Sequence, residues 1–363
     1  MLLFLGTVVV LIIVALIYVQ QEKFGELPSG KRKEIILKSP NYKKGGFRNL
    51  ELTPTMTGVE NFFKVLFELV FAKNRKPKNV LPTCKSNLKA ILNNENVLVW
   101  FGHASYFIQL DGTKYLIDPV LSGVASPVRF STKSFASTDV YTPEDLPEID
   151  YLILTHDHWD HMDYETIIKL KNKVKKYICG LGIGSHLHRW GISDNKILEF
   201  DWFDSAQLSD KVKIKIYPTR HYSGRSFIRN KALWISILLE SKTQTIYIGG
   251  DSGFGKHFEI IAEENPKIDL AILENGQYNK SWANIHMMPH QTLQAANILN
   301  AKRLMPIHSS KFILSTHAWN EPLAIISKLN EMGEKYLVTP VIGEIIDLND
   351  TARSFSKWWE NVE

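Results

Sequence analysis

The sequence predicts a layered α/β fold in which mixed strands and helices form one large domain, and three observations lead to this expectation. After residue 96, short β-branched and aromatic runs alternate with turns and helix-like segments, which is typical of strands and helices packed in layers. With 44% apolar residues in 363, the chain can bury a sizeable core. No internal repeat at a fixed period and no low-complexity tract interrupts this pattern.

The predicted elements begin as a β-meander, because Asp111-Gly112 is a hairpin signal between two strand-like runs. Strands are expected before each candidate functional loop, since a strand can hold the loop at its end rigidly. Predicted strands cover residues 97–101, 106–110, 114–118, 151–155, 212–217, 234–239, 245–248 and 304–307, and predicted helices cover 164–171 and 290–300.

Residues 2–19 are uncharged and almost wholly apolar, which is long enough for a helix to cross the hydrocarbon layer of about 30 Å. We therefore expect an uncleaved transmembrane anchor over residues 1–20. A cleaved signal peptide is the alternative, but no Lys or Arg precedes the run and no Ala-x-Ala site follows it. Lys23 and the cluster 31–33 follow the span, so the positive-inside rule places the C-terminal bulk in the cytosol.

The extension after the anchor, residues 21–94, is basic. Residues 1–100 carry 15 Lys and Arg against 7 Glu and no Asp, whereas the rest of the chain is slightly acidic. Such residues beside an apolar segment suit an anionic membrane surface, and no basic motif with interleaved aromatics points to nucleic acid. A solvated linker is the alternative. No feature of the sequence specifies an oligomeric state.

An amphipathic helix is predicted over residues 59–73 of this extension. Glu60, Lys64 and Glu68 recur every four residues and share one narrow stripe, which leaves the aromatic residues on the wide remainder of the surface. The helix either buries these aromatics against the main domain or lies in a bilayer interface. The aromatic residues concerned are Phe62, Phe63, Phe67 and Phe71.

The densest chemical signal is the segment 155–161, which follows an apolar strand. His156, His158, Asp160 and His161 offer imidazole nitrogens and a carboxylate, the ligands that Zn²⁺ accepts in a hydrolytic site. Because alternating residues of extended backbone point to opposite sides, the first two can bind one ion and the last two a second. A polar surface loop is the alternative, but surface histidines rarely cluster this closely. Cys84 and Cys179 lie far apart and form no CxxC, so a thiolate site is not indicated.

Further ligands are expected at three other strand ends. His221 follows residues 212–217, Asp251 follows 245–248, and His308 follows 304–307. The glycines on both sides of Asp251 let the backbone turn tightly around a carboxylate that could bridge two ions. Taken singly, each residue could equally be a capping Asp or a hydrogen-bonded histidine, and only the first cluster makes them candidate ligands.

This set of motifs resembles the metallo-β-lactamase superfamily over residues 95–350. Within it, the segments 116–119, 199–204 and 250–254 and the interval from His286 to His308 are similar to the branch that hydrolyses N-acyl-phosphatidylethanolamine as a phospholipase D. Part of the pattern is shared with the ascorbate-6-phosphate lactonase group. Ser309 stands where this branch usually has Trp, and Trp159 stands where it has a smaller aromatic, so the substrate wall is expected to differ.

The resemblance implies an αββα sandwich that holds two Zn²⁺ ions, with iron or manganese as alternatives. It divides the chain into the anchor (1–20), the extension (21–94), the hydrolase domain (95–350) and a C-terminal tail (351–363). It also implies the ligand sets: His156, His158 and His221 for one ion, Asp160, His161 and His308 for the other, and Asp251 between them.

The expected chemistry is hydrolysis by a hydroxide formed between two metal ions. Asp160 and Asp251 are expected to orient this nucleophile. His286 either contacts the phosphate and moves a proton to the leaving group or only orients a ligand, and His103 is expected to be structural.

The expected substrate is a membrane phospholipid of the N-acyl-phosphatidylethanolamine type, because the predicted anchor and basic extension would hold the site at the bilayer. The alternatives are a lactonase or other small-substrate hydrolase, which needs no tether, and an inactive membrane-bound interaction module.

Overall fold

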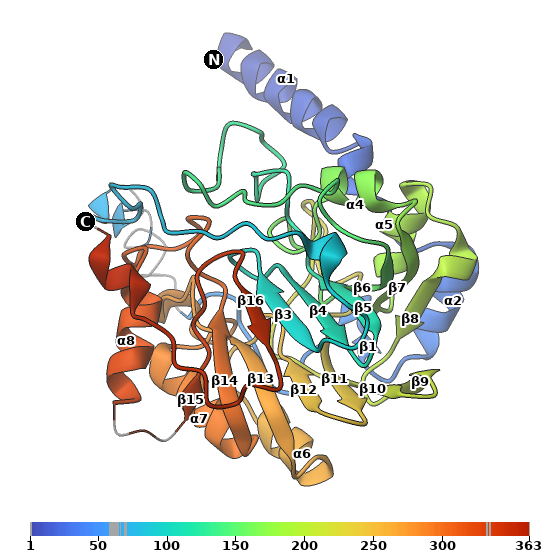
Figure 1. Ribbon diagram of the computed structural model, residues 1–363. Helices are drawn as coiled ribbons and strands as arrows, with labels where there is room; N and C mark the ends of the chain where they lie inside the picture. The colour runs from blue at the N-terminus through green and yellow to red at the C-terminus, as the bar shows by residue number, and fades with distance from the viewer. Residues whose placement is uncertain are drawn as a thin grey trace.

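The computed structural model describes residues 2–57, 65, 67–68, 71–331, 333 and 335–362. Two seven-stranded sheets lie face to face in it (Figure 1). The first has the order β16 (Ile345–Asp347), β3 (Val97–Trp100), β4 (Tyr106–Leu110), β5 (Thr113–Ile117), β6 (Ile149–Leu154), β7 (Val174–Gly180) and β8 (Ile197–Phe200). The second has the order β15 (Tyr336–Leu337), β14 (Ala301–Ile307), β13 (Ile268–Glu274), β12 (Thr245–Ile248), β11 (Ser236–Ser241), β10 (Val212–Tyr217) and β9 (Ser205–Ser209).

Helices cover the outer faces of both sheets. Successive residues of a strand point to opposite faces, so in β6 Ile153 belongs to the cluster between the sheets and Leu152 to the cluster on the outer face. The helices on the first sheet are α4 (Tyr164–Leu170) and α5 (Ile183–Arg189), and those on the second are α6 (His257–Glu264), α7 (Pro289–Ile298) and α8 (Glu321–Leu329). The predicted αββα sandwich is thereby confirmed.

Parallel pairing brings the functional loops to one edge of the sandwich. β5, β6, β7 and β8 are mutually parallel in the first sheet, as are β12, β13 and β14 in the second. Because the carboxyl ends of parallel strands lie at the same edge, the loops after β6, β12 and β14 meet there. β10 also points to this edge, since it is antiparallel to β11 and β11 is antiparallel to β12.

The predicted membrane-spanning helix over residues 1–20 is not supported. Helix α1 (Leu2–Tyr18) covers most of this range. Across the described ranges, no helix combines the length and the apolar character needed to cross a membrane.

The N-terminal extension and the C-terminal tail pack into the same core as the sheets. They include α2 (Gly30–Lys38) and the hairpin of β1 (Tyr42–Lys43) and β2 (Gly46–Phe47). Ile36, Phe47, Leu81 and Trp359 all belong to the cluster between the sheets. Neither segment is therefore a loose appendage.

The predicted amphipathic helix over residues 59–73 lies mostly outside the described residues. Val65, Phe67, Glu68 and Phe71 are helical. Phe67 and Phe71 are exposed and contact each other, with ring centroids 4.4 Å apart and ring planes tilted by 38°. Of the two alternatives, burial of the aromatics against the main domain does not hold for Phe67 and Phe71, and Phe62 and Phe63 lie outside the described part.

Candidate metal centre

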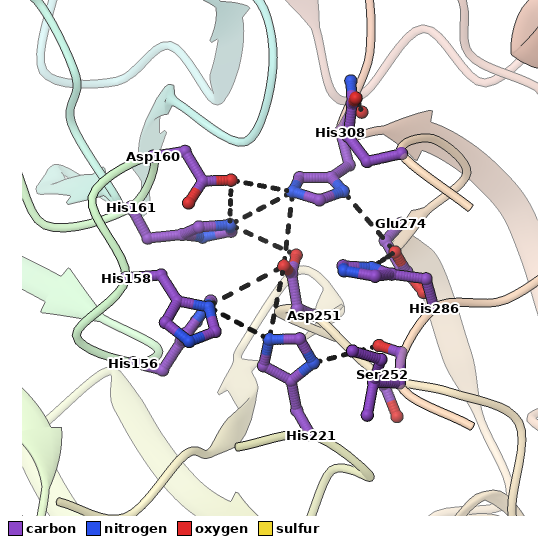
Figure 2. A network of polar contacts seen from close by, with 12 residues as sticks. His156, His158, Asp160, His161, His221, Asp251, Ser252, Glu274, His286 and His308 are labelled. Atoms are coloured by element: carbon purple, nitrogen blue, oxygen red, sulfur yellow. Dashed lines mark hydrogen bonds and ion pairs between the residues drawn. The ribbon is translucent and has the colours of Figure 1, made fainter. Parts of the chain in front are cut away.

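Loops from both sheets bring the seven predicted ligand residues into one cluster (Figure 2). Six of the seven are buried and His158 is half-buried, although the sequence separates the first from the last by about 150 positions. The segment 155–161 supplies His156, His158, Asp160 and His161, and the loops after β10, β12 and β14 supply His221, Asp251 and His308.

The first donor set joins His156, His158, His221 and Asp251. His158 Nδ1 lies 2.9 Å from His156 Nε2 and 3.2 Å from His221 Nε2. Asp251 Oδ2 lies 3.8 Å from the former Nε2 atom and 3.7 Å from the latter. Ligands of a tetrahedral Zn²⁺ site, at about 2.0–2.1 Å from the ion, are about 3.3 Å apart, so this spacing fits one cation.

The second donor set joins Asp160, His161 and His308. His308 Nε2 lies 3.3 Å from both His161 Nε2 and Asp160 Oδ2. Asp251 faces this set too, with Oδ1 3.2 Å from His161 Nε2 and Oδ2 3.2 Å from His308 Nε2. Asp251 therefore lies between the two sets, where a bridging carboxylate would be.

The buried Oδ1 atom of Asp251 supplies the test of whether cations fit here. Within the described structure it accepts no hydrogen bond, although it lies among imidazole nitrogens. A buried carboxylate oxygen without a hydrogen bond is unfavourable unless a cation satisfies it. Both sets consist of imidazole nitrogens and carboxylate oxygens, which are suitable ligands for divalent zinc, iron or manganese.

The protonation of the candidate ligands differs from one histidine to the next. Burial lowers the pKa of His156 and of His221 well below the usual range, which leaves both rings neutral and able to coordinate. Burial alone would also lower the pKa of His308, but Asp251 and Asp160 outweigh it and raise this pKa to about 10. Cation binding must then displace a proton from His308, so metal uptake releases protons.

Asp118, at the end of β5, positions one predicted ligand. Its Oδ2 lies 2.8 Å from His161 Nδ1 and accepts a hydrogen bond of 2.6 Å from Thr155 Oγ1. Its Oδ1 accepts the backbone N–H of Thr155 at 2.8 Å. The carboxylate thereby directs His161 Nε2 into the cluster. The segment 116–119 carried the family resemblance, but its role in the site was not predicted.

Glu274, the last residue of β13, is a second positioning carboxylate that the sequence analysis missed. It is fully buried, lies 2.7 Å from His286 Nδ1 through Oε2, and accepts the backbone N–H of Met287 through Oε1. The same Oε2 lies 3.5 Å from His308 Nδ1. The sequence signal that could have identified this residue is a Glu at the end of the largely apolar run 268–274. Because Nδ1 of His286 is held in this way, Nε2 is left for the site.

His103 and Asn49 also contact the cluster. His103 Nε2 lies 2.9 Å from Asp160 Oδ2. His103 has a positive φ of 53° and was expected from the sequence to be structural. Asn49, from the extension, donates to the backbone O of His221 at 2.7 Å and accepts its N–H at 3.1 Å. This role of Asn49 had no signal in the sequence, because its partner is 172 residues away.

Arg225 ties the metal-binding loop to the N-terminal segment. Its guanidinium donates to the backbone O of Asp157 at 3.0 Å, of Met162 at 2.7 Å and of Lys23 at 2.8 Å. It also lies 4.0 Å from the ring centre of Trp159, which packs edge-on against Phe24. These contacts fix the shape of the loop between its ligands.

Gly253 permits the close approach of two loops beside Asp251. A Cβ at this position would lie 2.0 Å from the backbone O of Asn284, which no side chain can tolerate. The glycine therefore allows the Asp251 loop to pack against the segment that carries His286, as the glycine pattern of the sequence predicted.

A pocket of about 470 Å³ opens above the two donor sets. Its floor includes His158, Asp160, Asp251, His286 and His308. Its walls mix polar and apolar side chains. The polar wall residues include Thr55, Ser226, Gln277 and Arg229, and the apolar and aromatic ones include Met56, Trp159, Tyr222, Trp282, Ile285 and Leu314. A reacting group placed on the floor would thus have an apolar neighbourhood on several sides.

Comparisons with known proteins agree with this geometry. The sequence-family model described as the beta-lactamase superfamily domain matches residues 113–309 of this chain. An uncharacterized protein of Mycobacterium tuberculosis is 31% identical over 337 residues, which cover 88% of this chain and 87% of that protein. The N-acyl-phosphatidylethanolamine-hydrolyzing phospholipase D 1 of Caenorhabditis elegans is 26% identical over 327 residues, which cover 81% of this chain and 89% of the relative. Igni18, a metallo hydrolase from Ignicoccus hospitalis, has the same fold, with a TM-score of 0.52, 19% identity and coverage of 70% of this chain and 98% of that structure.

Proposed function

The chain belongs to the metallo-β-lactamase superfamily, a family of metal-dependent hydrolases, and from this membership we propose that it is a phospholipase D-type phosphodiesterase acting on membrane phospholipids such as N-acyl-phosphatidylethanolamine. The observation that carries the proposal is the pair of donor sets sharing Asp251 at the floor of a pocket whose walls include several apolar and aromatic side chains. Such a site suits a substrate whose reacting group is an anion and whose flanks are hydrocarbon.

The proposed reaction consumes water and breaks the bond between phosphorus and the ethanolamine oxygen. The products are phosphatidic acid and the N-acylethanolamine. When bound, two divalent cations supply hydroxide from water at neutral pH and neutralise negative charge on the phosphoryl oxygens. We assign zinc by the donor chemistry, with iron or manganese as alternatives.

The residues of the chain then have separate roles. His156, His158 and His221 would hold one cation, Asp160, His161 and His308 would hold the other, and Asp251 faces both sets. Asp160 and Asp251 also orient the attacking oxygen from the pocket floor. His286 delivers the proton that the leaving alkoxide needs, because Glu274 holds its Nδ1 at 2.7 Å and leaves Nε2 toward the pocket.

The lipid substrate is supported by apolar side chains that the fold leaves uncovered. Helix α1 projects from the body of the molecule (Figure 1), and the side chains of residues 4–14 are exposed, with Phe4 75% exposed. Large exposed apolar surfaces mark contacts with proteins or membranes. We propose that this surface rests against lipid, which would bring the pocket to a substrate that does not leave the bilayer.

The test is to incubate the purified full-length protein, loaded with Zn²⁺, with N-acyl-phosphatidylethanolamine in mixed micelles and to measure phosphatidic acid by mass spectrometry. Release of phosphatidic acid, abolished by Asp160→Ala, is the expected result. Rapid opening of a lactone without phosphatidic acid would favour the small-substrate hydrolase instead. No turnover of any phosphodiester by fully metal-loaded protein would favour the inactive module.

A further inference from the structure

A loop that borders the pocket has a fixed base and an exposed tip. We call residues 223–230 the rim loop. At its base, the N–H of Asn230 donates to the backbone O of Ser223 at 2.9 Å, and the N–H of Ser223 donates to Asn230 Oδ1 at 3.3 Å. At its tip, Phe227 is 74% exposed and Ile228 is 46% exposed. The loop therefore presents apolar side chains from a closed frame rather than from a free end.

Arg229 occupies the position in this loop that reaches the pocket. Its guanidinium carbon lies 5.0 Å from the ring centre of Tyr222, and the Tyr222 ring lies 4.4 Å from the ring of His158. A single aromatic ring thus separates the cation from one of the donor sets. Stacking on a ring holds a guanidinium in place without neutralising its charge.

Arg229 is exposed and has no carboxylate partner among the described residues. Among the ion pairs of the described residues, none includes Arg229, in contrast to Arg129, which contacts Glu165 at 2.9 Å. Arg229 is also the sole Lys or Arg among the described residues that line the pocket. A cation without an ion pair, at a pocket with several aromatic wall residues and beside exposed Phe227 and Ile228, is suited to a ligand that carries both an anion and hydrocarbon.

We infer that Arg229 is a substrate-binding residue that contacts the phosphodiester anion and selects charged diesters over neutral esters and lactones. The inference rests on the proposed function and adds the group that determines specificity. N-acylation removes the amine charge of the ethanolamine head group, which leaves the phosphodiester as the charge that a protein can bind. The planar guanidinium matches two phosphate oxygens at once, whereas the ammonium of a Lys acts as a point charge.

The test compares two substrates with the same leaving group. Bis(4-nitrophenyl) phosphate is an anionic diester, and its methyl triester is neutral. With full-length Zn²⁺-loaded protein, Arg229→Gln is expected to lower kcat/KM for the diester about 10-fold, mainly through KM, with no change for the triester. Arg229→Lys should restore part of the loss. The matched control is Arg48→Gln, since Arg48 is an exposed arginine outside the pocket lining.

The outcomes separate this inference from the proposed function. An equal loss on both substrates would make Arg229 a structural residue, and no loss on either would also overturn the inference. If the parent protein cleaves neither substrate, the proposed function is in doubt, and titration calorimetry with inorganic phosphate then decides the inference. A Kd for phosphate about 10-fold higher in Arg229→Gln than in the parent supports the inference. This difference should become smaller in 0.5 M NaCl, because salt screens exposed charges. An unchanged Kd refutes the inference.

Discussion

Replacement of Asp118 by Asn removes a charge from the centre of the site while it preserves the shape of the side chain. Asp118 is 1% exposed, and its two oxygens contact Thr155 and His161. In Asp118→Asn the amide oxygen can still accept the N–H of Thr155. The amide NH₂ then faces His161 Nδ1, which must lose its proton or its partner.

The magnitude follows from the contact that is lost. A hydrogen bond to a charged group contributes about 1.5–3 kcal/mol, and the bond between Asp118 and His161 at 2.8 Å is of this kind. The Thr155 hydroxyl, which donates to the same oxygen, can rotate and accept from the amide instead. A loss of about 2 kcal/mol corresponds to a metal Kd about 30-fold higher, which agrees with the 10- to 100-fold effect typical of residues that orient metal ligands.

The assay is competition for Zn²⁺ between the protein and a chromophoric chelator, with thermal unfolding measured in parallel. The matched control is Asp150→Asn, at the opposite end of β6, where the carboxylate contacts Lys114 and Lys175 but no predicted ligand. Equal zinc affinity in Asp118→Asn and in the parent protein would refute the assignment of Asp118 as a positioning residue.

Three further perturbations have defined outcomes. Removal of metal by a chelator should lower the free energy of unfolding by about 4 kcal/mol relative to protein at a metal concentration of 1,000 Kd, and an unchanged urea midpoint would argue against cation binding by the folded state. Gly253→Ala should cost about 3 kcal/mol in urea unfolding, because its Cβ would lie 2.0 Å from the backbone O of Asn284, whereas Gly6→Ala, with nothing within 4 Å, should be tolerated. Burial lowers the pKa of His257 to about 3, so between this value and about pH 6.5 the unfolded chain binds one more proton than the folded chain. The free energy of unfolding of the parent protein therefore falls by about 1.4 kcal/mol for each pH unit of acidification in this window. In His257→Gln this contribution is absent, so the free energy of unfolding should fall less steeply with acidification. Urea melts of parent and variant at pH 5 and pH 7 measure this difference, and parallel slopes would contradict it.

The sequence predicted those parts of the fold and site that depend on local pattern. Strands β4, β10 and β12 have the bounds that alternation and turn residues indicated. The seven candidate ligands could be found because each stands at a strand end, and strand ends of like direction meet at one edge. Their assignment to two ions remains a prediction.

The parts that could not be predicted depend on contacts across the fold. Asp118, Glu274 and Asn49 act through partners that their sequence neighbourhood does not reveal. The predicted membrane-spanning helix is not supported. Hydropathy continues through Val19, but the helix ends at Tyr18, whose hydroxyl donates to the backbone O of Pro127 and so joins this end of the helix to the body of the protein.

The contacts of Asn49 and Arg225 have a consequence for the order in which the chain can fold. Asn49 pairs with a residue 172 positions later, and Arg225 pairs with one 202 positions earlier. During synthesis, the first 50 residues emerge long before either partner exists, so the loops that carry His158 and His221 can reach their final shape only late. Contacts between such distant residues slow folding, because a long loop must close before they form. We expect full metal affinity to appear in the last phase of refolding, together with burial of Phe24 against Trp159.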